Sequence, residues 1–258
     1  MNHHLSLTLG TTLISTILHG QDITKEEILK FNIKSITVTA DDSICKAETI
    51  YFYNDQGDIE NIDDKDCLTG ITRKNFAYDS QRLLREEKTF RLDGRIQQVD
   101  KYFYDSKNHL IKKESIDSIG RIDVYWTYEY DDIGNKIKET QKSLTKENRV
   151  TRYKYANGKL TEEETSNDLV EMIDLMTYKY NNEGKLIESQ AKDHFNRITT
   201  SVYTYNEAGK LLKLEQKLSD DVSVVITYKY GDRGLLENCF WRSSLERTPY
   251  KTIYKVTY

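Results

Sequence analysis

Six aromatic side chains have the chemistry and spacing of a binding surface, because flat rings stack on the apolar faces of sugar rings. They are Trp126, Tyr130, Tyr155, Tyr180, Tyr205 and Trp241. The four tyrosines follow one another at steps of 25 residues, so a regular fold would place them on one surface. Such a row forms either an exposed carbohydrate-binding strip or a half-buried seam between structural units. The match between the spacing and a repeat favours the seam.

The remaining candidate groups predict no catalytic or metal site. Asp79, Asp105 and Asp131 recur at similar spacing, but hard cations need converging oxygens, and Asp is expected at the first position of a turn. His109 and His194 fall in turns of different repeats, with no nucleophile or orienting acid placed beside them. The sequence contains no Walker A loop, dinucleotide-binding fingerprint, His-Glu-x-x-His motif or EF-hand loop. We therefore expect a protein that is not an enzyme and uses no cofactor or metal.

Aromatic-x-aromatic pairs recur through most of the sequence. The steps between the second members of successive pairs are 25 or 26 residues. A fixed period of this size indicates tandem repeats, in which each unit packs against its neighbours. The second aromatic residues are Tyr53, Tyr78, Tyr104, Tyr130, Tyr155, Tyr180, Tyr205 and Tyr230.

One repeat, residues 176–201, predicts a β-hairpin. Met176, Tyr178 and Tyr180 alternate with polar residues, which is the period of a strand. Asn181-Asn182-Glu183-Gly184 then suits a type I turn whose glycine has a positive φ. Two strands of about eight residues and two turns of about four give roughly 24 residues, close to the period.

Glycine recurs at this turn position in most repeats. In the second repeat Arg82 or Gln81 stands near this position, and in the third repeat Asn108 does. Because arginine rarely adopts positive φ, we expect an irregular second hairpin. The predicted structural turn glycines are Gly57, Gly134, Gly158, Gly184, Gly209 and Gly234.

Short connections between hairpins predict an all-β antiparallel fold. Hydrophobic residues make up 37% and charged residues 31% of the chain, so a thin sheet is favoured over a compact core. We expect an elongated, twisted sheet of tandem hairpins, either an open meander or a short superhelical array. A capping box at Thr24-Lys25-Glu26-Glu27 predicts a short helix over residues 25–31 that covers the first sheet edge.

The chain divides into three predicted parts: a signal peptide (1–20), a helix and capping segment (21–44) and the hairpin array (45–258). Residues 1–20 lack Lys, Arg, Asp and Glu and contain a mildly apolar run, which predicts export with cleavage after Gly20. The missing basic residues leave two alternatives, a first buried strand or a disordered leader. Export would place the protein outside the cell, in the periplasm or at the cell envelope, with no membrane span in the mature chain.

Charge and cysteine content limit the partners. The net charge is −4 with interspersed signs, and without a basic stripe we expect no nucleic-acid binding. The expected state is a monomer, with edge-to-edge association of sheets left open. Of three cysteines, Cys45 and Cys67 have the option of a disulfide in an oxidising compartment, and unpaired thiols are the alternative.

The segment Tyr-x-Tyr-[Asp/Asn]-x-x-Gly-[Lys/Asn]-[Leu/Ile], present at 128–137, 178–186 and 203–211, resembles the YD repeat of the RHS family. The resemblance covers about residues 45–258 and extends to short secreted YD-repeat proteins of Bacteroidetes-type bacteria. The Tyr-Asp pair itself is present at Tyr78-Asp79, Tyr104-Asp105 and Tyr130-Asp131.

Large RHS proteins wind such strands into a closed shell around a toxin and cleave themselves at a C-terminal motif with Asp-Pro pairs. This sequence has no Asp-Pro pair, and eight or nine units are few for a large shell. The resemblance therefore implies the hairpin repeat without the toxin-delivery role.

These features predict a binding or scaffold module with an unidentified protein or glycan partner. The first alternative is carbohydrate binding along the tyrosine-rich face, which requires aromatic rings exposed on a concave surface. A second is an immunity-like partner of a secreted toxin, which requires an acidic patch; Asp220-Asp221 and Glu162-Glu163-Glu164 are the densest acidic segments. A structural spacer would bury its aromatic rings and present a featureless charged surface.

Overall fold

The computed structural model describes residues 23–41, 46–66, 70–145, 147–218, 222–244 and 250–258. The predicted signal peptide and both Cys45 and Cys67 lie outside these residues, as does the acidic pair Asp220-Asp221.

The described residues form one helix, α2 (Lys25–Lys30), and eighteen strands. The strands are β1 (Ser35–Asp41), β2 (Lys46–Tyr53), β3 (Ile59–Asp66), β4 (Gly70–Tyr78), β5 (Leu84–Phe90), β6 (Ile96–Tyr104), β7 (Leu110–Asp117), β8 (Ile122–Tyr130), β9 (Lys136–Ser143), β10 (Arg149–Ala156), β11 (Lys159–Asn167), β12 (Asp174–Tyr180), β13 (Leu186–Asp193), β14 (Ile198–Tyr205), β15 (Leu211–Lys217), β16 (Ser223–Tyr230), β17 (Leu236–Ser243) and β18 (Tyr250–Thr257).

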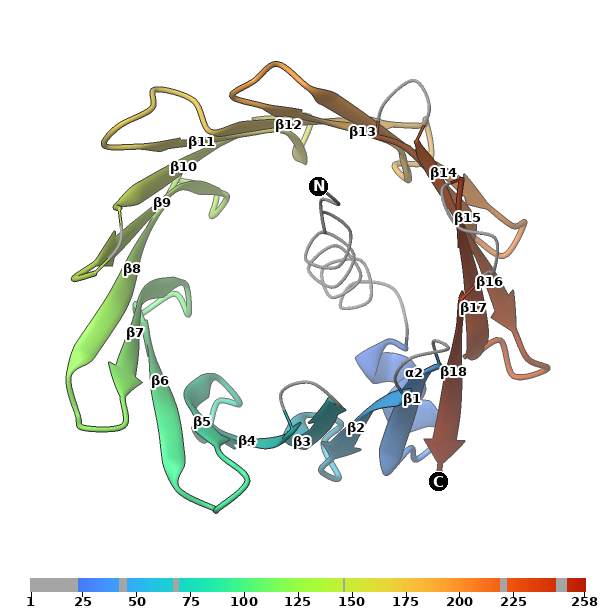
Figure 1. The fold of residues 1–258 in the computed structure, drawn as a ribbon, viewed down its shortest axis with the longest axis horizontal. Coiled ribbons are helices and arrows are strands. Elements are labelled where there is room, and N and C mark those ends of the chain that lie inside the picture. The colour runs from blue at the N-terminus through green and yellow to red at the C-terminus, as the bar shows by residue number, and fades with distance from the viewer. Residues whose placement is uncertain (1–22, 42–45, 67–69, 146, 219–221, 245–249) are drawn as a thin grey trace, which may run out of the picture.

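The strands close into an antiparallel β-barrel (Figure 1). Each strand pairs with the next along the chain, and β1 pairs with β18 from Ser35 opposite Thr257 to Asp41 opposite Lys251. The prediction of an open meander or superhelical array is therefore wrong. Closure satisfies the backbone groups of both terminal strands, which an open sheet would leave as two unpaired edges.

The second tyrosine of a pair marks a β-bulge at the end of its strand. In β12 and β13 the register shifts between Lys179 and Tyr180, so that Tyr180 lies opposite Leu186. Gly184 follows with φ +84°, and the other five predicted turn glycines also have positive φ. The bulge and the left-handed residue together turn the chain within five residues.

The hairpin that contains Arg82 is regular, so the predicted irregularity is wrong. Arg82 adopts φ +66°, and its amide donates to the carbonyl of Asp79 as the glycines do in other repeats. Its guanidinium is held by Asp58 at 2.6 Å and by the carbonyl of Gln56 at 2.5 Å. These charge-assisted contacts offset the cost of a left-handed arginine, which is about 1–2 kcal/mol.

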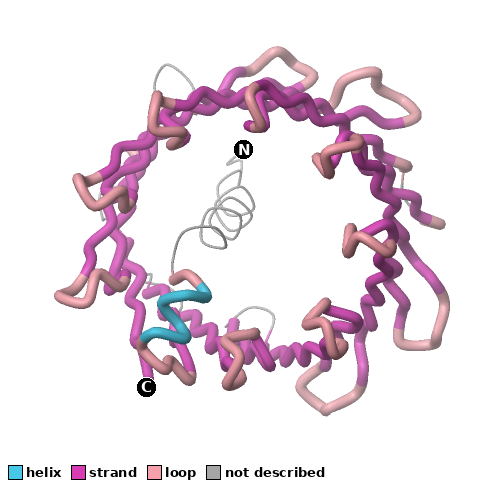
Figure 2. Tube along the Cα trace, turned by 180° about the vertical axis from the view of Figure 1, so that it is seen from behind, coloured by secondary structure: helices cyan, strands magenta, loops and turns pink. Residues whose placement is uncertain are grey.

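The barrel narrows toward the tyrosine end. In Figure 1 the turns that follow the tyrosine pairs project inside the ring, whereas the connections at the other end lie outside it. We call these ends the narrow rim and the wide rim. Figure 2 shows the same arrangement from behind, with α2 against the inner side of the wall.

Helix α2 packs inside the barrel at the narrow rim. Thr24 and Glu27 form the predicted capping box, and the buried Ile28 faces the wall. Lys25 forms an ion pair with Asp58 after β2, and Glu27 forms one with Lys210 after β14 at 2.6 Å. The helix therefore links the β2–β3 and β14–β15 hairpins, which lie on opposite sides of the closing β1–β18 pair, instead of covering a sheet edge as predicted.

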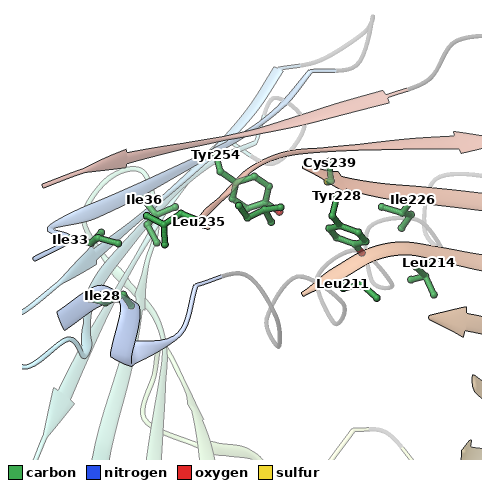
Figure 3. Close-up of a cluster of buried hydrophobic side chains, with 11 residues drawn as sticks. Ile28, Ile33, Ile36, Leu211, Leu214, Ile226, Tyr228, Leu235, Cys239 and Tyr254 are labelled. Carbon is green, nitrogen blue, oxygen red and sulfur yellow. The ribbon is translucent and has the colours of Figure 1, made fainter. Parts of the chain in front are cut away.

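The apolar core lies between α2 and one part of the inner wall (Figure 3). Leu214 and Leu236 are fully buried there. The cluster comprises Ile28, Ile33, Ile36, Leu211, Leu214, Ile226, Tyr228, Leu235, Leu236, Cys239 and Tyr254.

Candidate binding surface on the inner wall

Alternation along the strands places the tyrosine pairs on the inner face of the barrel. In β16, Ile226 and Tyr228 belong to the core packed against α2, while Thr227 and Lys229 between and beyond them are exposed on the opposite face. Residues that are paired on neighbouring strands point to the same face, so the pairing register extends this assignment of inner and outer residues to the other strands of the wall. All six predicted stacking residues, Trp126, Tyr130, Tyr155, Tyr180, Tyr205 and Trp241, therefore face inward.

The second tyrosine of a pair forms a hydrogen bond between hairpins. Its hydroxyl donates to the backbone carbonyl of the residue that begins the return strand of the preceding hairpin. Because that carbonyl lies at the bulge, the phenol satisfies an acceptor where the ladder is interrupted. The six such bonds are Tyr78 to Ile59, Tyr104 to Leu84, Tyr130 to Leu110, Tyr155 to Lys136, Tyr205 to Leu186 and Tyr230 to Leu211, at 2.8–3.0 Å.

The residue after the turn glycine covers the ring of the next repeat. Lys159 Nζ lies 5.2 Å from the centre of the Tyr180 ring. The same position gives Lys185 over Tyr205. Where the position holds His109, its ring stacks on Tyr130 with centroids 4.6 Å apart. Cation–π contacts of this kind explain why Lys follows the glycine in the repeat motif.

The first aromatic of a pair takes part in a different network, which we call the tyrosine–carboxylate belt. The belt consists of Glu87, Asp100, Tyr102, Lys113, Trp126, Tyr128, Lys136, Glu139, Tyr153, Glu163 and Tyr178.

Phenol hydroxyls and carboxylates are joined within the belt. The Tyr102 hydroxyl donates to Glu87 at 3.1 Å, and the Tyr153 hydroxyl donates to Glu139 at 3.2 Å. Burial, reinforced by the neighbouring negative charges, raises the pKa of Tyr102 and Tyr153 far above the ordinary value for a phenol. These phenols therefore remain protonated donors throughout the physiological range.

Lysines of the belt lie between carboxylates and aromatic rings. Lys113 Nζ is 2.7 Å from Asp100 and 4.9 Å from the centre of the Trp126 ring. Lys136 Nζ is 3.0 Å from Glu139 and 4.3 Å from the centre of the Tyr153 ring. The belt thus combines flat rings, hydroxyl donors and charges of both signs in one layer of the wall.

The belt occupies one arc of the wall. The residue opposite the first aromatic of each pair changes character from strand to strand. This residue is charged or polar on β5, β7, β9, β11 and β13, and it is apolar on β15, β17 and β3. The polar arc therefore lies away from α2, and the apolar arc carries the core. Around the wall these residues are Ile62, Glu87, Lys113, Glu139, Glu163, Ser189, Leu214 and Cys239.

The turn carboxylates form local hydrogen bonds. Asp79 Oδ1 accepts from the amides of Gln81 and Leu83, and Asp105 Oδ1 accepts from the amides of Lys107 and His109. Backbone hydrogen bonds hold the pKa of both carboxyls below its usual value. In the described part of the chain no group of three His, Cys, Asp or Glu side chains has metal-binding geometry.

The two predicted tryptophans have different surroundings. Trp126 lies in the belt, whereas Trp241 packs against the apolar core. The belt carboxylates Glu87, Glu139 and Glu163 are not among the site residues predicted from the sequence. The spacing within each hairpin could have indicated them, because each glutamate lies 10 or 11 residues after the first aromatic residue of a pair and so faces that residue across the hairpin.

The outer wall carries charged cross-strand pairs. Lys154 lies opposite Glu162 at 2.5 Å, and Lys179 lies opposite Glu188 at 2.8 Å. These residues alternate with the inward tyrosines along the same strands. The same outer face also carries partly exposed apolar side chains, among them Phe103, Val202, Phe240 and Ile253.

Comparisons with known proteins identify the fold and no family. No family model matches the chain, and no curated protein matches it. A porin-like protein from Bacteroides uniformis is similar in structure with a TM-score of 0.51 and 13% identity, over 87% of this chain and 98% of that one. A TcdB2-TccC3-Cdc42 structure is similar with a TM-score of 0.41 and 12% identity, over 80% of this chain and 14% of that one.

The described residues include no helix of the length and apolarity needed to cross a membrane. The strand pairing shows a closed antiparallel β-barrel, and the fold is similar to that of the porin-like protein.

Proposed function

We propose that this barrel is an exported binding protein, without enzymatic activity, that holds a neutral, hydroxyl-rich ligand such as an oligosaccharide against the tyrosine–carboxylate belt. The observation that carries the proposal is the position of the belt on the concave inner wall. An aromatic surface with a few placed polar groups is the usual composition of a small-molecule site.

The inner wall is wide enough for such a ligand. Eighteen strands about 4.8 Å apart and tilted by about 40° enclose a ring roughly 35 Å across between backbones. Belt residues such as Tyr128, Glu139 and Tyr153 are only half-buried, so solvent reaches this part of the wall. A ligand would replace that solvent without unfolding the wall.

The charge balance of the belt favours a neutral ligand. Of the four belt carboxylates, Asp100 is paired with Lys113, Glu139 with Lys136 and Glu87 with Lys74. A charged ligand would have to separate these pairs, whereas sugar hydroxyls both donate to carboxylates and accept from ammonium groups. The rings of Trp126 and Tyr128 supply flat apolar faces beside these groups.

The outer wall favours action in water over a membrane-spanning role. The outward residues Arg152 and Glu164 lie opposite each other near the middle of β10 and β11. The charged pairs Lys154–Glu162 and Lys179–Glu188 lie closer to the narrow rim. Charged side chains on a lipid-facing strand cost about 2–4 kcal/mol each at the bilayer midplane. We therefore place the barrel in the aqueous part of the envelope or outside the cell.

The acidic triplet gives no support to a toxin-partner role. Glu163 faces inward toward Tyr178, while Glu162 and Glu164 face outward opposite Lys154 and Arg152. The three carboxylates therefore do not form one acidic surface.

Binding is tested by titrating the protein with neutral oligosaccharides chosen from a glycan array. Both tryptophans face the inner wall, so binding at the belt is expected to change the intrinsic fluorescence. Trp126→Ala is expected to raise Kd at least about 10-fold, because it removes the largest ring of the belt.

Tyr125→Ala is the matched control, since Tyr125 is the adjacent residue on the outer face of β8. It is expected to leave Kd unchanged. Absence of binding to every glycan of the array, or an equal loss in both variants, would contradict a carbohydrate site at the belt.

A further inference from the structure

Exposed apolar side chains occupy the tips of five successive connections at the wide rim. They are Leu92 (68% exposed), Ile119 (70%), Leu144 (80%), Leu169 (75%) and Phe195 (66%). Leu92 lies over Gly70, and the Phe195 ring lies against His194 and Arg197. Even so, the large apolar side chain at each tip stays at least 66% exposed. Its repetition in one connection after another therefore indicates a function of the rim itself.

The narrow rim lacks this pattern in its described turns. Ile133, at 83% exposed, is the one comparably exposed large apolar side chain among the turns described there. The corresponding positions of other narrow-rim turns hold Gln56, Gln81, Lys107, Glu183 and Arg233. The connections that carry Leu92, Ile119 and Phe195 have the same five-residue turn as the narrow rim, so turn geometry does not explain the difference there.

Exposed guanidinium groups accompany three of the five apolar tips. Arg95, Arg121 and Arg197 lie close in sequence to Leu92, Ile119 and Phe195, and their side chains are 72–79% exposed. Each arginine also contacts an aspartate of its own turn. At these three tips the rim presents apolar side chains beside hydrogen-bond donors that suit phosphate groups, whereas Leu169 has the acidic neighbours Asp168 and Glu171 in the sequence.

We propose that the wide rim docks on the surface of a phospholipid bilayer, with its apolar tips inserted to the depth of the headgroups. Neighbouring hairpins place the tips roughly 10 Å apart, so they form separate points and not one continuous patch. A protein interface needs a continuous, closely packed area of roughly 800 Å² on each partner. Fluid lipid fills the spaces between separate points, and interfacial proteins combine such side chains with basic residues.

A second copy of the chain fits the rim less well. Two apposed wide rims would bring the Asp93–Arg95 and Asp193–Arg197 pairs of both copies into the contact together with the apolar tips. These polar groups would lose water without gaining matched partners. At a bilayer the same groups stay in the hydrated headgroup layer.

The test is sedimentation of the full chain with vesicles of phosphatidylcholine and phosphatidylglycerol. The triple variant Ile119→Ser, Leu144→Ser, Phe195→Ser is expected to lower the partition coefficient roughly 100-fold, since three apolar side chains no longer leave water. The matched control Ile133→Ser changes an equally exposed isoleucine at the narrow rim and is expected to keep the wild-type value. The three single variants are measured as well, and each is expected to give an intermediate value.

Equal partitioning of the triple variant and the wild-type chain would overturn the proposal, as would absence of binding to the vesicles. Sedimentation velocity without lipid distinguishes self-association. A concentration-dependent dimer that the triple variant abolishes, in a protein that does not bind vesicles, would assign the rim to a second copy instead.

Discussion

Leu214→Ala is expected to lower the free energy of unfolding by about 3–4 kcal/mol. Leu214 is 0% exposed and lies on the inner face of β15, opposite Tyr203 on one side and Ile226 on the other. The substitution removes buried methyl groups and leaves a cavity that the hydrogen-bonded wall cannot close. Urea denaturation followed by circular dichroism measures the change.

Leu212→Ala is the matched control on the same strand. Leu212 is 39% exposed on the outer face, so its loss is expected to cost less than about 1 kcal/mol. Similar losses for the two leucines would mean that the assignment of inner and outer faces is wrong.

Tyr155→Ala is expected to lower the free energy of unfolding by about 2–3 kcal/mol. The substitution removes a half-buried ring and the 3.0 Å hydrogen bond from its hydroxyl to the carbonyl of Lys136. That carbonyl belongs to the preceding hairpin, so the substitution weakens the packing of one repeat against the next. Tyr155→Phe retains the ring and is expected to cost about 1 kcal/mol, the usual value of one hydrogen bond.

Lys154→Ala provides the comparison for the outer wall. Lys154 neighbours Tyr155 in β10 and forms a solvent-exposed ion pair with Glu162. Exposed pairs contribute little to stability, so the denaturation midpoint is expected to stay unchanged. A larger effect for Lys154→Ala than for Tyr155→Ala would contradict the seam formed by the second tyrosines.

The sequence predicts the hairpins because their signals are local. The alternation up to Tyr180, the Asn181 turn and the positive φ of Gly184 each depend on a few neighbouring residues. Closure depends on β1 meeting β18, which are separated by more than two hundred residues. Because β1 lies before the recognisable repeats, the period alone gave no indication that it completes the wall.

The inner-wall site was only partly predictable for the same reason. Trp126 and the tyrosines are conspicuous by residue type and spacing. Glu139 and Glu163 become part of one surface only when the hairpin register places them opposite Tyr128 and Tyr153. In the sequence these glutamates look like the charged residues of any exposed strand.

Closure of the barrel is tested most directly by a cross-link between its first and last strands. Thr37 and Lys255 lie opposite each other on the outer faces of β1 and β18, where paired Cβ atoms are about 5 Å apart. With the three native cysteines replaced by alanine, Thr37→Cys with Lys255→Cys is expected to form an intramolecular disulfide on mild oxidation. Thr37→Cys with Thr127→Cys, which joins β1 to the distant β8, is expected to form none. Mass spectrometry that finds only intermolecular disulfides, or none, in the first variant would contradict the closed barrel.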